Sequence, residues 1–330
     1  GAFFHLKNLV VAAAVEPSYP VVMRGMLMRT CPKCGLEYDI AEERCLRCGT
    51  PQTPLPRKRK IEPGALLGKT FRYKLESLLG KGKNAEVWLA KDLKMRGGLF
   101  ALKALKTPIA KIKKEALRAC QSAAKIAETR VHPNLARIFS FETDEEFAFF
   151  VSEYVKGATL ESLLKKRKKL TEDEVLWVAR EACLGLLYLH QTGLSHGALA
   201  LSNMILSESP KNDTLPTVPT ARSHPHQCVR LADWVISIAI EKTASKTVSK
   251  TPAKMIVGDM RALGGLLYNL LTGKSLPSNL KDLTLPKGAS PLISEVLKIC
   301  MAPPAAIKSD SAGRVISIIE RGQKEMVVLD

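Results

Sequence analysis

Four cysteines near the beginning of the sequence have the spacing of a metal site. They form two Cys-x-x-Cys pairs, Cys31 with Cys34 and Cys45 with Cys48, and a glycine follows each pair. Thiolates at this spacing can converge on one tetrahedral zinc ion, while the glycines let backbone amides turn towards the sulfurs. Because this segment is short and has almost no apolar residues to form a core, zinc binding would have to stabilise its fold. We expect a structural zinc site; four unrelated reduced thiols are the alternative.

A glycine-rich turn and a lysine suggest a second kind of chemistry further along. Gly80 and Gly82 separate two stretches of strand-like alternation, with Val87 shortly after, and Lys103 lies within the apolar run Phe-Ala-Leu-Lys-Ala-Leu. Small residues in a strand-turn-strand let backbone amides approach phosphates. Each signal is weak alone, because hairpin glycines are common and a strand lysine usually snorkels to the surface. Together, in this order, they predict a phosphate site.

A polar loop, 195–203, lies between a long helical pattern and a short apolar run. Thr171 and Glu174 are typical of a capping box at the beginning of that helix, and Gly193 ends it. A polar loop held between two apolar elements often carries functional residues.

This loop resembles the catalytic loop of the eukaryotic-type protein kinases, which is His-Arg-Asp-Leu, three spacer residues and Asn. Here the run His-Gly-Ala-Leu-Ala-Leu-Ser-Asn extends from His196 to Asn203. His196 and Asn203 are retained, but Ala198 occupies the position of the catalytic aspartate. Ala200 replaces the lysine that Ser/Thr kinases carry two residues later. A methyl group cannot accept a proton from a substrate hydroxyl, so no intact catalytic set is expected.

The resemblance extends to other motifs in the same order and implies an ATP site. Phe-Ala-Leu-Lys matches the strand that carries the phosphate-pairing lysine, Glu153 and Val155 fall in the hinge that holds adenine, and Asp233 takes the magnesium position. It implies nucleotide contacts from Gly80, Gly82, Val87, Lys103, Glu153, Val155, Asn203 and Asp233, with Mg²⁺ held by Asn203 and Asp233.

The resemblance also bears on two acidic positions outside these motifs. In the family, a glutamate on the helix expected over 111–127 pairs with the strand lysine, here Lys103. Glu115 is the only acid early in this helix, but the family's position falls nearer Gln121. The partner of Lys103 is therefore expected to be Glu115 or no residue of this helix. The resemblance also implies that Asp259, on a buried helix, braces the catalytic loop by hydrogen bonds.

The predicted fold class is α+β. We expect a two-lobed protein-kinase-like fold, with an antiparallel sheet and one helix in the N-lobe and a mainly helical C-lobe, preceded by a small four-cysteine zinc ribbon. The predicted parts are an unassigned segment 1–28, the ribbon 29–50, a Pro-rich and basic linker 51–66, an N-lobe 67–155 and a C-lobe 156–322. A polar, non-helical segment is expected over 236–257.

Charge and cysteine usage limit the partners. The chain has 50 Lys and Arg against 32 Asp and Glu, a net charge of +18, which favours anionic partners without selecting among them. The cysteine pattern suits metal binding in a reducing cytoplasm better than a disulfide framework. No run is long enough to predict a membrane span. A signal peptide at 3–15 is the less favoured alternative for the first residues.

Three functions are compatible with the sequence. The first is a pseudokinase that binds ATP and Mg²⁺ and acts on a protein partner as a signalling scaffold or regulator. The second is a weakly active or unorthodox Ser/Thr kinase, since positioning and electrostatics supply most of phosphoryl-transfer catalysis. The third is an adaptor whose zinc ribbon and basic runs bind nucleic acid or protein.

Overall fold

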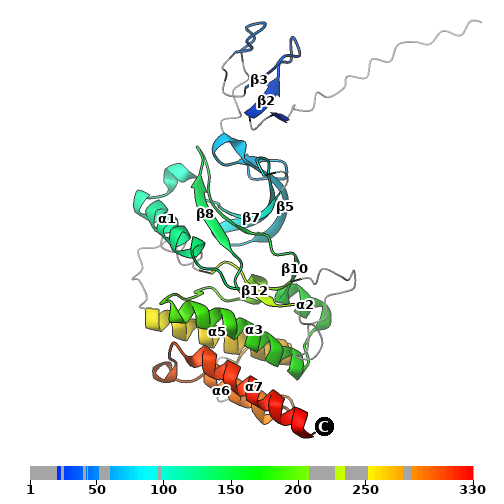
Figure 1. Cartoon of the computed structure of the whole chain (residues 1–330), viewed down its shortest axis with the longest axis vertical. Coiled ribbons are helices and arrows are strands. Elements are labelled where there is room, and N and C mark those ends of the chain that lie inside the picture. The colour runs from blue at the N-terminus through cyan, green and yellow to red at the C-terminus, as the bar shows by residue number, and fades with distance from the viewer. Residues whose placement is uncertain are drawn as a thin grey trace, which may run out of the picture. The chain divides into compact units, whose positions relative to one another are not determined.

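The computed structural model describes residues 21–23, 26–39, 42, 44–51, 60–95, 98–207, 227–234, 252–277, 279 and 284–329 (Figure 1). The chain divides into two compact units. One comprises 1–75 with 91–98, and the other comprises 76–90 with 99–330.

The first unit contains the cysteine-rich segment. A three-stranded antiparallel sheet is formed there by β1 (Val21–Met23), β2 (Met26–Thr30) and β3 (Glu37–Asp39). Cys31, Tyr38 and Cys45 are buried and form its small core. This core is too small to stabilise a fold by apolar burial alone, as the sequence indicated.

A six-stranded antiparallel sheet has the order β4-β5-β6-β7-β9-β8. Alternating burial in β5, where Tyr73 and Leu75 are buried and their neighbours exposed, shows why this sequence forms a strand with one face on the core. The strands are β4 (Leu66–Leu67), β5 (Tyr73–Lys81), β6 (Ala85–Asp92), β7 (Leu99–Leu105), β8 (Ile138–Thr143) and β9 (Ala148–Glu153).

The second unit continues with helices and a small sheet (Figure 1). Helix α1 (Lys114–Glu128) packs against β8 through Ala116, Cys120, Ala124 and Ala127. A three-stranded antiparallel sheet consists of β10 (Gly157–Thr159), β11 (Met204–Ser207) and β12 (Val229–Leu231). The other helices are α2 (Leu160–Arg167), α3 (Glu172–Gln191), α5 (Pro252–Thr272), α6 (Pro291–Cys300) and α7 (Ser311–Leu329), with short 3₁₀ turns η1 (Lys69–Phe71), η2 (Ile109–Lys111), η3 (Leu201–Asn203) and η5 (Pro304–Ala306).

Helix α3 is the central element of the helical part, because it packs against both α5 and α7. Its first turn has the predicted capping box: the Thr171 hydroxyl accepts from the Glu174 N–H, and the Glu174 carboxylate accepts from the Thr171 N–H. Glu174 also receives two hydrogen bonds from the Arg167 guanidinium at 2.6 and 2.9 Å. The end of α2 and the beginning of α3 are thereby tied together.

The two-lobed fold class predicted from the sequence is confirmed, with an antiparallel sheet and α1 followed by a helical part. The non-helical segment expected over 236–257 is wrong at its end, because α5 begins at Pro252 and its first turns include Ile256, which is buried. Residues 236–251 of that segment lie outside the described residues. Among the helices that the structure describes, none has an apolar stretch of the length and hydropathy needed to cross a bilayer.

Gly157 offers a test of the small sheet that links the hinge strand to β11. A Cβ added at Gly157 would lie 2.0 Å from the backbone oxygen of Leu206. Gly157→Ala should therefore lower the free energy of unfolding by about 1–3 kcal/mol or more, because backbone must move to accommodate it. Urea denaturation of the full chain, followed by tryptophan fluorescence, measures the change.

The matched control is Gly258→Ala on α5, where an added Cβ meets no atom within 4 Å. Because alanine is a better helix former than glycine, this variant should raise stability by about 0.5–1 kcal/mol. Equal stability of the Gly157 variant and the parent would show that the β10–β11 pair relaxes freely.

Candidate active site

One buried carboxylate on α5 holds the backbone of the loop 195–203. The Asp259 side chain, on α5, accepts hydrogen bonds from the backbone N–H groups of His196 at 2.7 Å and Gly197 at 2.8 Å. His190 Nε2 lies 3.1 Å from the same carboxylate. Asp259 is 2% exposed, so an unpaired charge there would be costly, and these donors satisfy it. The bracing role expected of Asp259 is confirmed.

His196 is fully buried beneath the loop. Burial lowers the pKa of His196, and the carboxylates of Asp259 and Asp233 oppose that shift. A neutral imidazole in this position supports the loop from inside and does not face a substrate. His196 is therefore a structural residue of the loop.

Asn203 closes the loop on itself. Its side-chain Nδ2 donates to the carbonyl of Ala198 at 2.9 Å, and its own backbone carbonyl accepts from the Ala232 N–H at 2.8 Å. Because the amide nitrogen is used as donor, the orientation of the side chain is fixed and its oxygen is available as a ligand for a hard cation. The second contact places Asn203 next to the chain that leads to Asp233.

Lys103 and Asp233 meet although they are 130 residues apart in sequence. Lys103 Nζ donates to Asp233 Oδ2 at 2.9 Å, and the two side chains are 13% and 18% exposed. Lys103 lies on β7 and Asp233 follows β12, so the ion pair joins the large sheet to the small one. The ammonium and the carboxylate are the two charges required to hold a nucleotide phosphate and its metal ion.

The backbone at Asp233 is held by the residue that follows it. Asp233 has φ 64°, a conformation uncommon outside glycine. Trp234 is fully buried, and its indole N–H donates to the Ala136 carbonyl at 2.8 Å. The Leu231 N–H donates to the Asn134 carbonyl at 2.8 Å, so this segment is anchored on both sides of Asp233.

The glycine-rich turn joins β5 to β6, as predicted. The Gly82 N–H donates to the Ala85 carbonyl at 2.9 Å, and the Gly82 carbonyl accepts from Lys106 Nζ at 2.6 Å. Nothing lies within 4 Å of a Cβ built at Gly80, which leaves open space beside the backbone. Val87 is on β6, partly exposed. A backbone open on one side is what close approach of a phosphate requires.

The hinge follows β9. The Glu153 N–H donates to the Arg137 carbonyl at 2.8 Å, and its carboxylate accepts from Arg230 at 2.5 Å and from the Arg137 N–H at 3.0 Å. Val155 is 8% exposed. The side chain of Glu153 is thus used to hold the hinge, and only backbone groups of this segment remain for a ligand edge.

Helix α1 does not supply a buried acid opposite Lys103. Both of its acids, Glu115 and Glu128, are exposed, and Gln121 is exposed as well. The buried face of the helix is apolar. Lys103 pairs with Asp233, and Glu115 lies on the exposed face of the helix.

Comparison with known proteins agrees with this geometry. The family model for the protein kinase domain matches residues 73–311. The chain belongs to the protein kinase domain family.

Several named kinases resemble it at low identity. Serine/threonine-protein kinase PknB of Mycobacterium leprae is 26% identical over 226 residues, covering 62% of this chain and 33% of the relative. A probable serine/threonine-protein kinase, CCRP1 of Zea mays, is 27% identical over 252 residues, covering 72% and 35%. PknD of Chlamydia trachomatis is 31% identical over 149 residues, covering 41% and 15%. The chain spans about a third of the length of the first two relatives.

This kinase domain has one position where the constellation is chemically incomplete. Ala198, partly exposed, offers a methyl group in the loop otherwise fixed by Asp259 and Asn203. The buried carboxylate of Asp259 accepts two backbone N–H groups of this loop, so its contacts are to the loop backbone. The structure therefore assembles Lys103, Asp233 and Asn203 around a loop that has a methyl group where the family has its base.

Some residues of the site were not found by sequence reasoning. Arg230 and Lys106 hold the hinge and the glycine-rich turn, yet neither lies in a motif. Arg230 lies between the buried Val229 and Leu231 on a short strand, and the alternation of apolar and polar residues there can be read from the sequence. Its partner Glu153, however, is 77 residues away. Long-range partners of this kind have no local signal.

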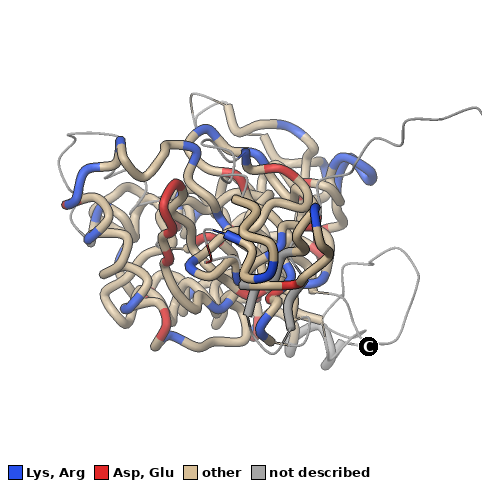
Figure 2. The backbone as a smooth tube through the Cα atoms, turned by 90° about the horizontal axis from the view of Figure 1, so that it is seen from above, with Lys and Arg blue, Asp and Glu red and all other residues tan. Residues whose placement is uncertain are grey.

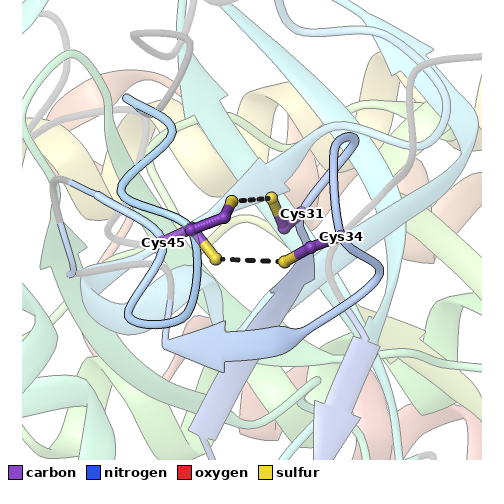
Figure 3. A group of neighbouring side chains, drawn as sticks. Cys31, Cys34 and Cys45 are labelled. Carbon is purple, nitrogen blue, oxygen red and sulfur yellow. Dashed lines mark hydrogen bonds between the residues drawn. The ribbon is translucent and has the colours of Figure 1, made fainter.

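The four cysteines of the ribbon converge as predicted. Figure 3 shows Cys31, Cys34 and Cys45 directed towards one another. All four ligand atoms, including that of Cys48, lie within 4.8 Å of one another. Gly35 and Gly49 have φ 70° and 66°, and their N–H groups bond back to the carbonyls of the first cysteine of each pair. This donor set fits a tetrahedral zinc ion.

The thiols of the ribbon differ in acidity before any metal binds. The Thr50 hydroxyl and backbone lower the pKa of Cys48 to about 6. The Leu36 backbone favours the Cys34 thiolate, but burial and the neighbouring sulfurs outweigh it and raise the pKa of Cys34 to about 12. Four thiolates this close repel one another, and a divalent cation would remove that repulsion.

Removal of the Asp259 carboxylate tests the brace of the loop. Asp259→Ala should lower the free energy of unfolding by about 2–5 kcal/mol, because it leaves buried backbone donors unpaired. Glu295→Ala, an exposed acid on α6, is the control and should change stability by less than about 0.5 kcal/mol. Similar stability of both variants in urea denaturation would contradict the role given to Asp259.

The zinc site predicts a metal content that depends on the ribbon cysteines alone. The purified chain should contain one zinc ion by elemental analysis, and Cys45→Ser should lose it, because three thiolates and a hydroxyl bind zinc far more weakly. Cys228→Ser, which changes a cysteine outside the cluster, should retain the metal. Retention of zinc by the Cys45 variant would refute this ligand set.

Proposed function

We propose that this protein is a pseudokinase: a kinase domain that binds ATP with Mg²⁺ and regulates or scaffolds a partner protein without efficient phosphoryl transfer. The observation that carries the proposal is the combination of Ala198 with an otherwise assembled set. Lys103 and Asp233 lie 2.9 Å apart, and Asn203 is fixed by its bond to Ala198.

The residues of this chain would divide the binding between them. Lys103 would pair with phosphate oxygens, and Asp233 and Asn203 would offer oxygen ligands to Mg²⁺. The turn at Gly80 and Gly82, with open space beside Gly80, would face the phosphates. Bound Mg²⁺ supplies neutralisation of phosphate charge, and these residues only position and hold.

The loss of the base affects turnover more than binding. A positioned general base contributes roughly 10²–10⁴-fold to a rate, and none of the binding groups depends on it. A protein that binds nucleotide and reacts slowly can use the bound nucleotide to fix one conformation of its domain. This supports regulation or scaffolding as the main activity.

A weakly active Ser/Thr kinase is the second candidate. The relatives named above are described as serine/threonine-protein kinases, and the positioning groups of such enzymes are present here. The pseudokinase and the weakly active kinase differ only in the rate of phosphoryl transfer, because positioning supplies most of the catalysis in this reaction.

A zinc-ribbon adaptor is the third candidate. Figure 2 shows Lys and Arg positions distributed along much of the chain with acidic positions between them. Dispersed basic residues of this kind indicate an anionic partner, but they are a weaker sign of nucleic-acid binding than a continuous basic stripe would be. We also propose a cytoplasmic location, which is supported by four thiols arranged for metal binding.

The deciding experiment is calorimetry of ATP binding with and without Mg²⁺. We expect Mg²⁺-dependent binding that weakens roughly 10–100-fold in Lys103→Ala and Asp233→Asn, since each removes a charge-assisted contact. Lys298→Ala, which changes an exposed lysine on α6, should bind like the parent. No binding at millimolar ATP would eliminate both the pseudokinase and the weak kinase.

Ala198→Asp then separates those two candidates. If only the base is missing, this variant should raise the rate of phosphate transfer to a generic basic protein by at least about tenfold over the parent, without changing ATP affinity. A parent that already transfers phosphate as fast as the variant would establish the weakly active kinase instead.

A further inference from the structure

A groove of about 550 Å³ lies on the helical part of the kinase domain. It is lined by residues of α2, α5 and η3. Its apolar lining is three leucines, Leu164, Leu201 and Leu266. Leu164 and Leu266 are only partly buried, so this apolar surface is accessible to another molecule.

Two of the four polar residues that line the groove are lysines, and the other two are Glu161 and Asn269. Lys165 and Lys168 line it, both exposed, and they belong to the run 165–169, which has five basic residues. Arg167 is occupied by its two bonds to Glu174. Glu161, the one acid lining the groove, is 3.2 Å from Lys165 in a solvent-exposed pair, so one net positive charge remains, and a stronger acidic partner would have to compete with Glu161 for Lys165. The remaining charge at the groove is positive.

The backbone at Lys168 is strained. It has φ 68° and ψ −34°, in a region where glycine is preferred. Its carbonyl lies against Gly273, where an added Cβ would be 2.6 Å from the Lys168 oxygen. A lysine at this position lowers the stability of the turn relative to glycine, and strain of this kind is found where a side chain serves binding.

We propose that this groove is a docking site for an acidic peptide segment of a partner protein. One or two large apolar side chains of the peptide contact Leu164, Leu201 and Leu266, and its carboxylates pair with Lys165 and Lys168. The site is separate from the nucleotide residues, so it stands whether or not ATP binds.

The lining selects a peptide over other anionic partners. A nucleic-acid backbone would use the lysines but would leave the leucines without apolar contacts. A second copy of this chain carries the same net charge of +18 and would be repelled. A peptide with both apolar and acidic side chains satisfies both parts of the groove.

The position of Leu201 gives the groove a route to the active site. Leu201 begins η3, the turn that ends at Asn203, and it is 8% exposed. A side chain inserted over Leu201 therefore contacts the loop that holds the magnesium position. A docked peptide would stabilise that loop.

The test uses the full chain and a fluorescein-labelled peptide of Asp and Glu residues with a central Leu-Asp-Leu. Fluorescence anisotropy should show binding that weakens at least tenfold in the double variant Lys165→Glu/Lys168→Glu. The matched control Lys298→Glu/Lys308→Glu makes the same change in net charge at exposed lysines outside the groove and should bind within twofold of the parent. Replacing both peptide leucines by alanine should also weaken binding at least tenfold.

Lys168→Gly separates binding from stability. Because glycine accepts this φ, the variant should unfold at higher urea concentration than the parent while binding the peptide several-fold more weakly. A merely structural lysine would change stability alone.

Three results would overturn the proposal. Equal binding of the leucine and alanine peptides would reduce the site to unspecific charge attraction. Loss of peptide affinity in the control variant equal to that in the groove variant would do the same. Binding to phosphatidylserine vesicles or to single-stranded RNA that depends on Lys165 and Lys168, without peptide binding, would assign the lysines to a different partner.

Discussion

The buried carboxylate of Asp259 is the interaction on which the site depends. It lies on α5, in the helical core, and it orders the backbone of the loop at His196 and Gly197 by accepting their N–H groups. Because the accepting carboxylate is buried, loss of these hydrogen bonds would be costly. The loop keeps its shape although the residue that would have done chemistry there, Ala198, contributes only a methyl group. Architecture and reactivity are therefore separable in this domain.

The second dependence is the junction between the two sheets. Lys103 comes from the large sheet and Asp233 from the end of the small one, and Trp234 anchors the latter by burying its indole against the Ala136 carbonyl. Neither charge is deeply buried, so the pair keeps partial contact with solvent and its desolvation cost is limited. The ion pair holds both groups in place before a ligand arrives, which lowers the ordering cost of binding.

Much of this could be predicted from the sequence where the signal is local. The capping box at Thr171, the turning glycines Gly35 and Gly49 and the strand around Lys103 each follow from residue type and spacing, and the structure has them where expected. The ligand roles of the nucleotide residues remain predictions. Pairings across long separations had no such signal. The Arg230 contact to Glu153 and the groove between α2 and α5 arise only when the chain is folded.

The Arg230 contact has a consequence for the design of ligands. Arg230 and Asp233 are three residues apart on one short segment, so the hinge, through Glu153, and the ion pair with Lys103 share a single mechanical support. A small molecule that displaces the Glu153 carboxylate from Arg230 would release one end of that support, and the aspartate at its other end would lose orientation. Compounds directed at this hinge would then also weaken the contact between Asp233 and Lys103, so they could be sorted by how far they loosen the large sheet from the small one.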